Sequence, residues 1–142
     1  MKADLEETYE ILDPLSPRAL PADRGGPRAG RDPSGTYLSE SGETRVRIAR
    51  CGQAYCGTII SVRGDAKDAN NPDASLRGRS LVGVQMISDI RPSGEGFTGQ
   101  LYNYKDGKTY TGKMSFAGKT MQLSGCVLGG LICRSQTWAK LN

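Results

Sequence analysis

The stretch TGQLYNYKDGKTYTGKMSF, residues 98–116, decides the fold of this chain. Its centre holds Asp106-Gly107, a dipeptide that favours the tight turn of a β-hairpin. After the turn, apolar and polar side chains alternate, which is the period of a strand with one buried face. The stretch therefore predicts two antiparallel strands, with an inner face that includes Tyr110, Met114 and Phe116.

The same pattern continues on both sides of this hairpin. Short segments rich in strand-forming residues are separated by turn signals about every ten residues, which is typical of all-β barrels and sandwiches. With the hairpin, these segments predict about eight strands in an antiparallel up-and-down β-barrel, because closure removes exposed strand edges. The segments outside the hairpin are GTYLS (35–39), TRVRIAR (44–50), GTIISV (57–62), SLVGVQMIS (80–88), TMQLSG (120–125) and ICRSQTWAKL (132–141).

The first 34 residues differ in composition from the rest of the chain. They are rich in Pro, Gly and Arg, and they contain five basic and seven acidic residues for a net charge of −2. Residues 35–142 contain fourteen basic and eight acidic residues, for a net charge of +6. We predict a flexible N-terminal tail over residues 1–34 and one barrel domain over residues 35–142. The alternative for the tail is a partner-binding arm.

The composition argues against several classes of function. The chain has no histidine, so it lacks the commonest general base and the commonest metal ligand. We therefore expect no enzyme activity, no metal site and no cofactor. No nucleic-acid-binding motif occurs, and no apolar run is long enough for a transmembrane segment. The first residues, MKADLEETYE, lack the apolar region of a signal peptide.

The four cysteines form two local pairs, and each pair flanks a predicted turn. Cysteines on adjacent strands can approach closely enough for a disulfide, so we expect the bonds Cys51–Cys56 and Cys126–Cys133. Each would add about 2 kcal/mol in the chain-entropy description. The alternatives are a four-cysteine zinc site and a redox-active pair. Disulfides indicate a periplasmic or secreted protein, with an export signal that has been removed or replaced.

The connection over residues 63–80 is longer than the others and has no periodicity. Loops of this length are often lids or binding segments, and the alternative is a mobile surface loop. The loop is rich in carboxylate and amide side chains, a composition that suits Ca²⁺, but their spacing does not match the twelve-residue calcium loop. A solvated, turn-rich loop explains them better. These residues are Asp65, Asp68, Asn70, Asn71 and Asp73.

Four motifs occur together in this order: CGQAYCG (51–57), NPD (71–73), YNYKDGKTY (102–110) and GC…CRSQTW (125–138). Over about residues 32–142 the chain resembles the bacterial family called domain of unknown function 2147. This resemblance implies a small exported protein with a lipocalin-like β-barrel, and it implies no particular activity.

Two positions depart from the family pattern: Tyr37 stands where Trp is usual, and Lys140 stands where Arg often follows Trp138. In lipocalin-like barrels these two elements close one end, with a cation over the indole ring. Here either Lys140 makes that contact more weakly, or Trp138 simply packs at the end of the barrel.

Two functions are compatible with these features. The first is binding of a small hydrophobic ligand inside the barrel; the competing interpretation is that the same inward side chains only fill the core. The second is an envelope interaction protein that contacts anionic lipid or a protein partner through a basic surface. The candidate pocket residues are Val46, Ile48, Ile60, Met86, Leu101, Met114, Phe116, Met121, Leu123 and Trp138. The basic candidates are Arg45, Arg47, Arg63, Arg77 and Arg79.

Overall fold

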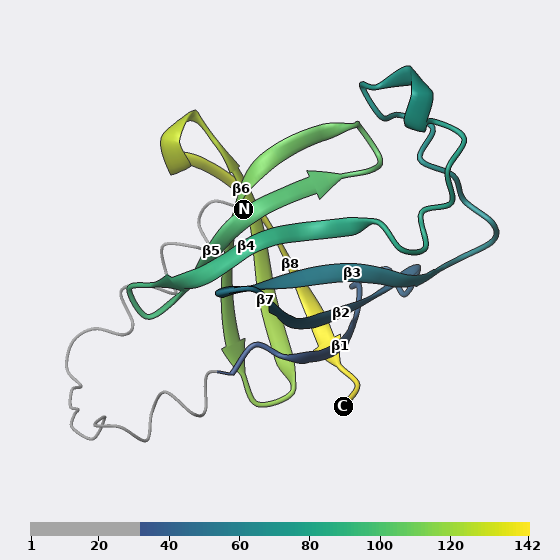
Figure 1. Cartoon of the computed structure of the whole chain (residues 1–142). Coiled ribbons are helices and arrows are strands. Elements are labelled where there is room, and N and C mark those ends of the chain that lie inside the picture. Colours follow the sequence, from purple (N-terminus) through teal and green to yellow (C-terminus); the bar gives the residue numbers. More distant parts are fainter. Residues whose placement is uncertain (1–31) are drawn as a thin grey trace, which may run out of the picture.

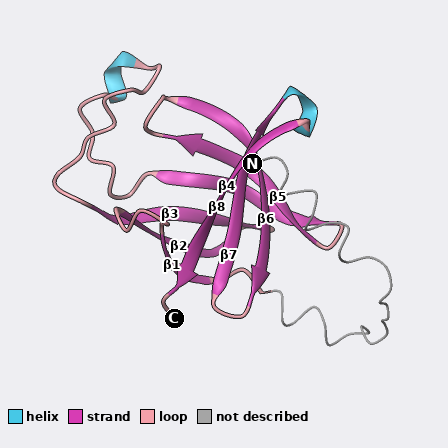
Figure 2. Cartoon of the chain, turned by 180° about the vertical axis from the view of Figure 1, so that it is seen from behind, coloured by secondary structure: helices cyan, strands magenta, loops and turns pink. Residues whose placement is uncertain are grey.

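Eight antiparallel strands form a closed barrel in the computed structural model, which describes residues 32–142 (Figures 1 and 2). Every strand pairs with its neighbours in chain order, and β1 closes the barrel against β8 through the pairs Tyr37–Lys140 and Leu38–Ala139. The predicted up-and-down barrel is confirmed. The strands are β1 (Gly35–Leu38), β2 (Thr44–Cys51), β3 (Ala54–Val62), β4 (Gln85–Ser93), β5 (Gly96–Asn103), β6 (Lys108–Ala117), β7 (Thr120–Val127) and β8 (Ile132–Lys140).

Within residues 32–142, two short 3-10 turns accompany the strands, η2 (Ala74–Leu76) and η3 (Leu128–Gly130). Neither of these helical turns, within the described residues, is long and apolar enough to cross a membrane. Residues 1–31 of the predicted tail lie outside the described part of the chain. Just before β1, Pro33 is buried, and Tyr37 Oη donates a hydrogen bond of 2.9 Å to its carbonyl oxygen.

The core forms where the alternating apolar side chains of different strands meet inside the barrel. Met114 of β6 lies opposite Leu123 of β7, and Phe116 lies opposite Met121. Burial of such side chains is the main favourable term in folding. The buried cluster contains Tyr37, Val46, Ile48, Ile59, Leu81, Val84, Met86, Ile87, Ile90, Phe97, Leu101, Met114, Met121, Leu123 and Trp138.

The prediction that Ile60 points inward is wrong, and its neighbour Ile59 takes that place. Val46 pairs with Ile59, whereas the preceding residue, Arg45, pairs with Ser61. Ile60 is therefore the extra residue of a β-bulge, where two residues of one strand oppose one of the other. Simple alternation fails at a bulge, which is why Ile59 is fully buried and Ile60 is only partly buried.

Aromatic side chains fill the barrel near the end where the β6–β7 turn lies. Phe116 packs edge-on against Phe97 at a centroid distance of 5.5 Å, and it lies 5.9 Å from Tyr37. Tyr37 thus fills the position where the family pattern has Trp, and burial raises its pKa to about 12. Trp138 packs in the core with 2% of its surface exposed. The cation–ring contact found within residues 32–142 is Arg50 over Tyr55, at 5.3 Å, and it does not involve Lys140.

Both disulfides join the cysteines that are close in sequence. Cys51 and Cys56 have Cα atoms 5.9 Å apart at the β2–β3 turn. Cys126 and Cys133 lie directly opposite each other on β7 and β8, with Cα atoms 4.1 Å apart. The second bond closes the base of the hairpin that contains η3, so it fixes the separation of the two strands at that end.

Replacing Cys126 and Cys133 together with serine is expected to lower the free energy of unfolding by about 2 kcal/mol, because the unfolded chain regains the entropy of a short closed loop. Urea denaturation of the oxidised proteins measures the difference. The matched control is the double replacement of Cys51 and Cys56, which opens a loop of similar length and should cost a similar amount. A free energy unchanged in both variants would contradict a stabilising role for these bonds.

The loop between β3 and β4 is folded around a buried carboxylate and extends to the right of the barrel in Figure 1. Asp68 is fully buried and accepts hydrogen bonds from Tyr102 Oη at 2.6 Å, Asn71 Nδ2 at 2.8 Å and Arg79 Nε at 2.9 Å. Leu81, also fully buried, anchors the end of the loop in the core. Asp68 therefore ties the loop to β5 through Tyr102.

Candidate functional site

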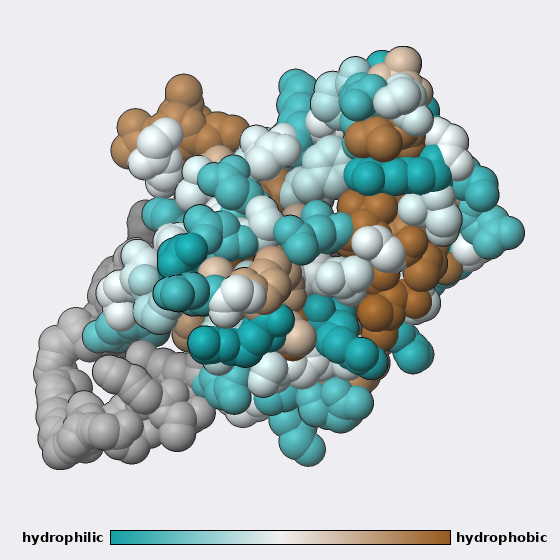
Figure 3. All heavy atoms as spheres, in the orientation of Figure 1, coloured by the Kyte–Doolittle hydropathy of each residue, from teal (hydrophilic) through white to brown (hydrophobic). Residues whose placement is uncertain are grey.

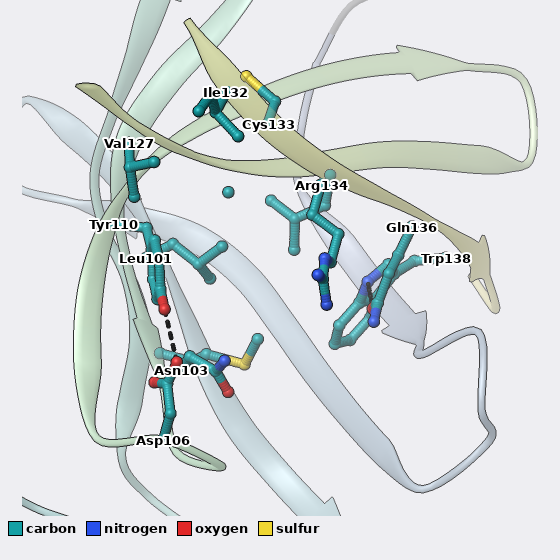
Figure 4. Close-up of a pocket in the computed structure, with 13 residues that line it drawn as sticks. Leu101, Asn103, Asp106, Tyr110, Val127, Ile132, Cys133, Arg134, Gln136 and Trp138 are labelled. Atoms are coloured by element: carbon teal, nitrogen blue, oxygen red, sulfur yellow. Dashed lines mark hydrogen bonds between the residues drawn. The ribbon is translucent and has the colours of Figure 1, made fainter. Parts of the chain in front are cut away.

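A cavity of about 600 Å³ opens between strands β4 to β8, at the end of the barrel where the β5–β6 turn and the β7–β8 hairpin lie (Figure 4). This volume lies within the range of small-molecule sites in proteins. The apolar part of its lining consists of Met86, Leu101, Leu123, Gly125, Val127, Ile132 and Trp138. The rest of the lining comprises Asn103, Asp106, Tyr110, Cys133, Arg134 and Gln136.

An inward position without a side chain borders the cavity. Gly125 of β7 lies two residues after the inward Leu123, so it shares the inward face, and it pairs with another glycine, Gly112 of β6. A Cβ atom on Gly125 would lie 3.3 Å from Leu101 Cδ2 and 3.7 Å from Tyr110 Cβ. A side chain at Gly125 would therefore press against Leu101 and, since Gly125 lines the cavity, would also take up part of its space.

A short hydrogen bond connects two polar residues of the lining. Tyr110 Oη donates to Asp106 Oδ2 at 2.5 Å, and Lys108 N donates to Asp106 Oδ1 at 2.9 Å (Figure 4). Burial raises the pKa of Asp106, but these hydrogen bonds outweigh burial and keep it below its ordinary value of 3.8. The hydrogen bond to Asp106, together with desolvation, raises the pKa of Tyr110. At neutral pH Asp106 is therefore ionised and Tyr110 is a protonated donor.

The ten predicted pocket residues divide between the cavity and the packed core. Met86, Leu101, Leu123 and Trp138 line the cavity. The other inward residues fill the barrel beyond it, and Ile60 faces away as described above. Those that pack in or against the core are Val46, Ile48, Met114, Phe116 and Met121. One end of the barrel is thus filled with side chains, and the other end borders the cavity.

Sequence reasoning overlooked the polar part of the lining. Arg134 and Gln136 share the inward face of β8 with Trp138, since they lie four and two residues before it. The two-residue spacing from Trp138 indicates that these side chains point inward, but charged residues are rare on the inward face of a barrel, so Arg134 was not expected there. The position of Asp106 depends on the turn that follows β5, which alternation does not describe.

The candidate basic surface is partly used for contacts within the protein. Arg79 pairs with the buried Asp68, and Arg77 Nε donates to Asn71 O at 2.7 Å. Arg63 lies 3.8 Å from a carboxylate oxygen of Glu43. Arg45 and Arg47 are exposed on the outer face of β2.

The acidic loop also has a structural explanation. The oxygens of Asp68 already accept three hydrogen bonds, and Asp73 Oδ1 accepts from Ser75 N at the start of η2. Over residues 32–142, no group of three His, Cys, Asp or Glu side chains is arranged to hold a metal ion.

Large apolar side chains are exposed on the hairpin beside the cavity. Leu128 and Leu131 are 66% and 80% exposed, and Val127 and Ile132 are about half exposed while they also line the cavity. In Figure 3 the brown cluster at the upper left lies where Figure 1 shows this hairpin. The edge of the cavity is therefore apolar on the side of β7 and β8.

The sequence of the barrel matches one known protein family. Residues 35–140 match the family described as "Uncharacterized protein conserved in bacteria (DUF2147)". This chain belongs to the DUF2147 family. The match covers all eight strands, so the family boundaries coincide with the barrel. The resemblance recognised from the four sequence motifs is confirmed.

A solved structure supports the same fold for this DUF2147 chain. It is the protein HP1028 from Helicobacter pylori, which is described as belonging to the lipocalin family. The two chains share 24% identity, with a TM-score of 0.71, and the alignment covers 79% of this chain and 84% of HP1028. The barrel is therefore lipocalin-like. No curated protein matches the chain.

Proposed function

We propose that this protein binds one small, largely apolar ligand in the cavity between β4 and β8. The observation that carries the proposal is the cavity itself, about 600 Å³ in a barrel whose other end is filled with aromatic side chains. Eight-stranded barrels are wide enough to hold one small ligand when side chains do not fill them. Binding without chemistry is the role that such a site supports.

We also propose that the protein works in the periplasm or outside the cell. The two disulfides support this location, because such bonds form and persist in oxidising compartments. Each disulfide joins two cysteines of one hairpin of this chain, so neither bond links it to a second protein. A small apolar molecule in water needs a carrier that shields part of its surface, and the partly apolar cavity supports this role.

The test of binding uses the only tryptophan of the chain, Trp138, which lies in the cavity wall. Titration with N-phenyl-1-naphthylamine, an uncharged apolar fluorophore, should change the fluorescence of Trp138 and saturate at one molecule per chain. Native mass spectrometry before and after denaturing extraction shows whether a lipophilic species is purified with the protein.

The variant Gly125→Val should weaken binding of this fluorophore about 10-fold or more, since its side chain occupies the cavity. A loss of this size is about 1.4 kcal/mol of binding free energy. The matched control is Thr111→Val, which places the same side chain on the exposed outer face of β6. If the wild type shows neither a saturable response nor a bound species, or if the two variants bind equally, the proposal is wrong.

A further inference from the structure

We propose that the cavity selects an anionic amphiphile, whose carboxylate or phosphate head group binds Arg134 while its apolar chain lies against Leu101, Leu123 and Trp138. This inference rests on the proposed binding function and adds the chemical class of the ligand. It follows from which polar groups of the lining already have partners within the protein and which do not.

Arg134 is a cation on the inner face of the barrel. It lies opposite Gly125 in the pairing of β7 with β8, so no side chain from the neighbouring strand covers it. Figure 4 shows its side chain reaching into the cavity beside Gln136 and Trp138. Across residues 32–142, no carboxylate oxygen lies within 4.0 Å of its guanidinium, and no hydrogen bond holds it. Arg134 is exposed at the mouth of the cavity, so an anion that binds its guanidinium replaces only water.

Two amide groups of the lining also present donors. Trp138 Nε1 donates to Gln136 Oε1 at 3.1 Å, which orients the Gln136 amide so that its NH₂ group is left over. Lys105 N donates to Asn103 Oδ1 at 2.9 Å, which leaves the NH₂ group of Asn103 in the same way. Neither NH₂ group has a partner among the described residues. Gln136 is exposed and Asn103 is partly buried, so these donors face water at the mouth of the cavity and can pair with a ligand that brings acceptor atoms.

The acceptors of the lining, in contrast, are largely occupied. Both oxygens of Asp106 accept hydrogen bonds, one from Tyr110 Oη and one from Lys108 N. An amine head group would be repelled by Arg134 and attracted by the ionised Asp106, so the two charges of the lining sort head groups by position. A head group beside Gln136 and Trp138 lies next to Arg134 (Figure 4), where an anion is favoured. A carboxylate or phosphate has only acceptor oxygens when ionised, and its hydrogen bonds with Arg are among the strongest that proteins make.

The experiment measures displacement of N-phenyl-1-naphthylamine by compounds that share one dodecyl chain. Dodecanoate and dodecyl phosphate carry anionic head groups, and 1-dodecanol is the neutral reference. At least one of the two anions should bind the wild type about 10-fold or more tightly than 1-dodecanol, which is the size of one hydrogen bond to a charged group. Comparing the two anions distinguishes a fatty-acid ligand from a phosphorylated lipid.

The variant Arg134→Gln should lose this preference, so that the anions bind no more tightly than 1-dodecanol, and Arg134→Lys should restore part of it. Expressing the result as the ratio of anion to alcohol affinity removes any general effect of a variant on the cavity. An alcohol that binds the wild type as tightly as both anions, or an unchanged ratio in Arg134→Gln, overturns this inference and leaves the binding function intact. If no dodecyl compound and no fluorophore bind the wild type, the binding function itself fails.

Discussion

Replacing Gly107 with alanine should lower the free energy of unfolding by about 4 kcal/mol, which would be the largest effect of a single methyl group in this barrel. Gly107 ends the β5–β6 turn with a φ of +76°, in the left-handed region that disfavours a side chain. A Cβ atom there would lie only 1.9 Å from the carbonyl oxygen of Asn70 and 2.9 Å from its carbonyl carbon. Both are backbone atoms of the β3–β4 loop, so no side-chain rotation relieves the overlap.

The matched control for this prediction is Gly118→Ala in the β6–β7 turn. Gly118 has a similar φ of +60°, but a Cβ atom there would meet nothing within 4 Å. Its replacement should cost only the conformational term, about 1 kcal/mol. Urea denaturation of both variants separates the two contributions. Equal losses in the two variants would show that the loop does not rest on Gly107 as the structure indicates.

Replacing Asp68 with alanine should lower the free energy of unfolding by about 3 kcal/mol, because three donors lose a common buried acceptor. Tyr102 and Asn71 would retain unpaired polar groups, and the Arg79 side chain, 41% exposed, could still reach water. We therefore place the loss at the low end of the range for broken buried ion pairs. The control is Asp73→Ala in the same loop, where an exposed carboxylate caps η2 and its removal should cost about 1 kcal/mol or less.

The contribution of Asp68 should also depend on pH. Burial raises its pKa, but the hydrogen bonds from Tyr102, Asn71 and Arg79 outweigh burial and hold the pKa below the ordinary value of 3.8. A carboxyl group with a lowered folded-state pKa stabilises the protein above its unfolded pKa, and this stability is lost as the pH falls through the folded pKa. Between pH 7 and the acid range below 3.8, the difference between wild type and Asp68→Ala should therefore shrink. A difference that grows with acidity would contradict the assignment.

Sequence alternation predicted the strands well where pairing is regular. In TRVRIAR and YTGKMSF, the residues expected to be inward are buried or packed against the core. The disulfides were also predictable, because each joins positions on one hairpin. Prediction failed at Ile60, where a bulge changes the register, and at β4, which was expected within residues 80–88 but runs from Gln85 to Ser93. Bulges depend on the partner strand, which a local pattern does not contain.

The sequence by itself determined the number and order of the strands, the closed barrel and the cysteine pairing. Strand order and cysteine pairing arise from residues close together in the chain, through the two-residue period of a strand and the conformations of tight turns. Closure joins distant residues of β1 and β8, and it was predictable because it removes exposed strand edges. Only the tertiary structure decided that one end of the barrel stays open, because Gly125 of β7 and Arg134 of β8 lie opposite each other there and line the cavity. The tertiary structure also adds a second reason for glycine at position 107. The Asp-Gly turn explains its positive φ, and the carbonyl group of Asn70, distant in the chain, leaves no room for a Cβ atom.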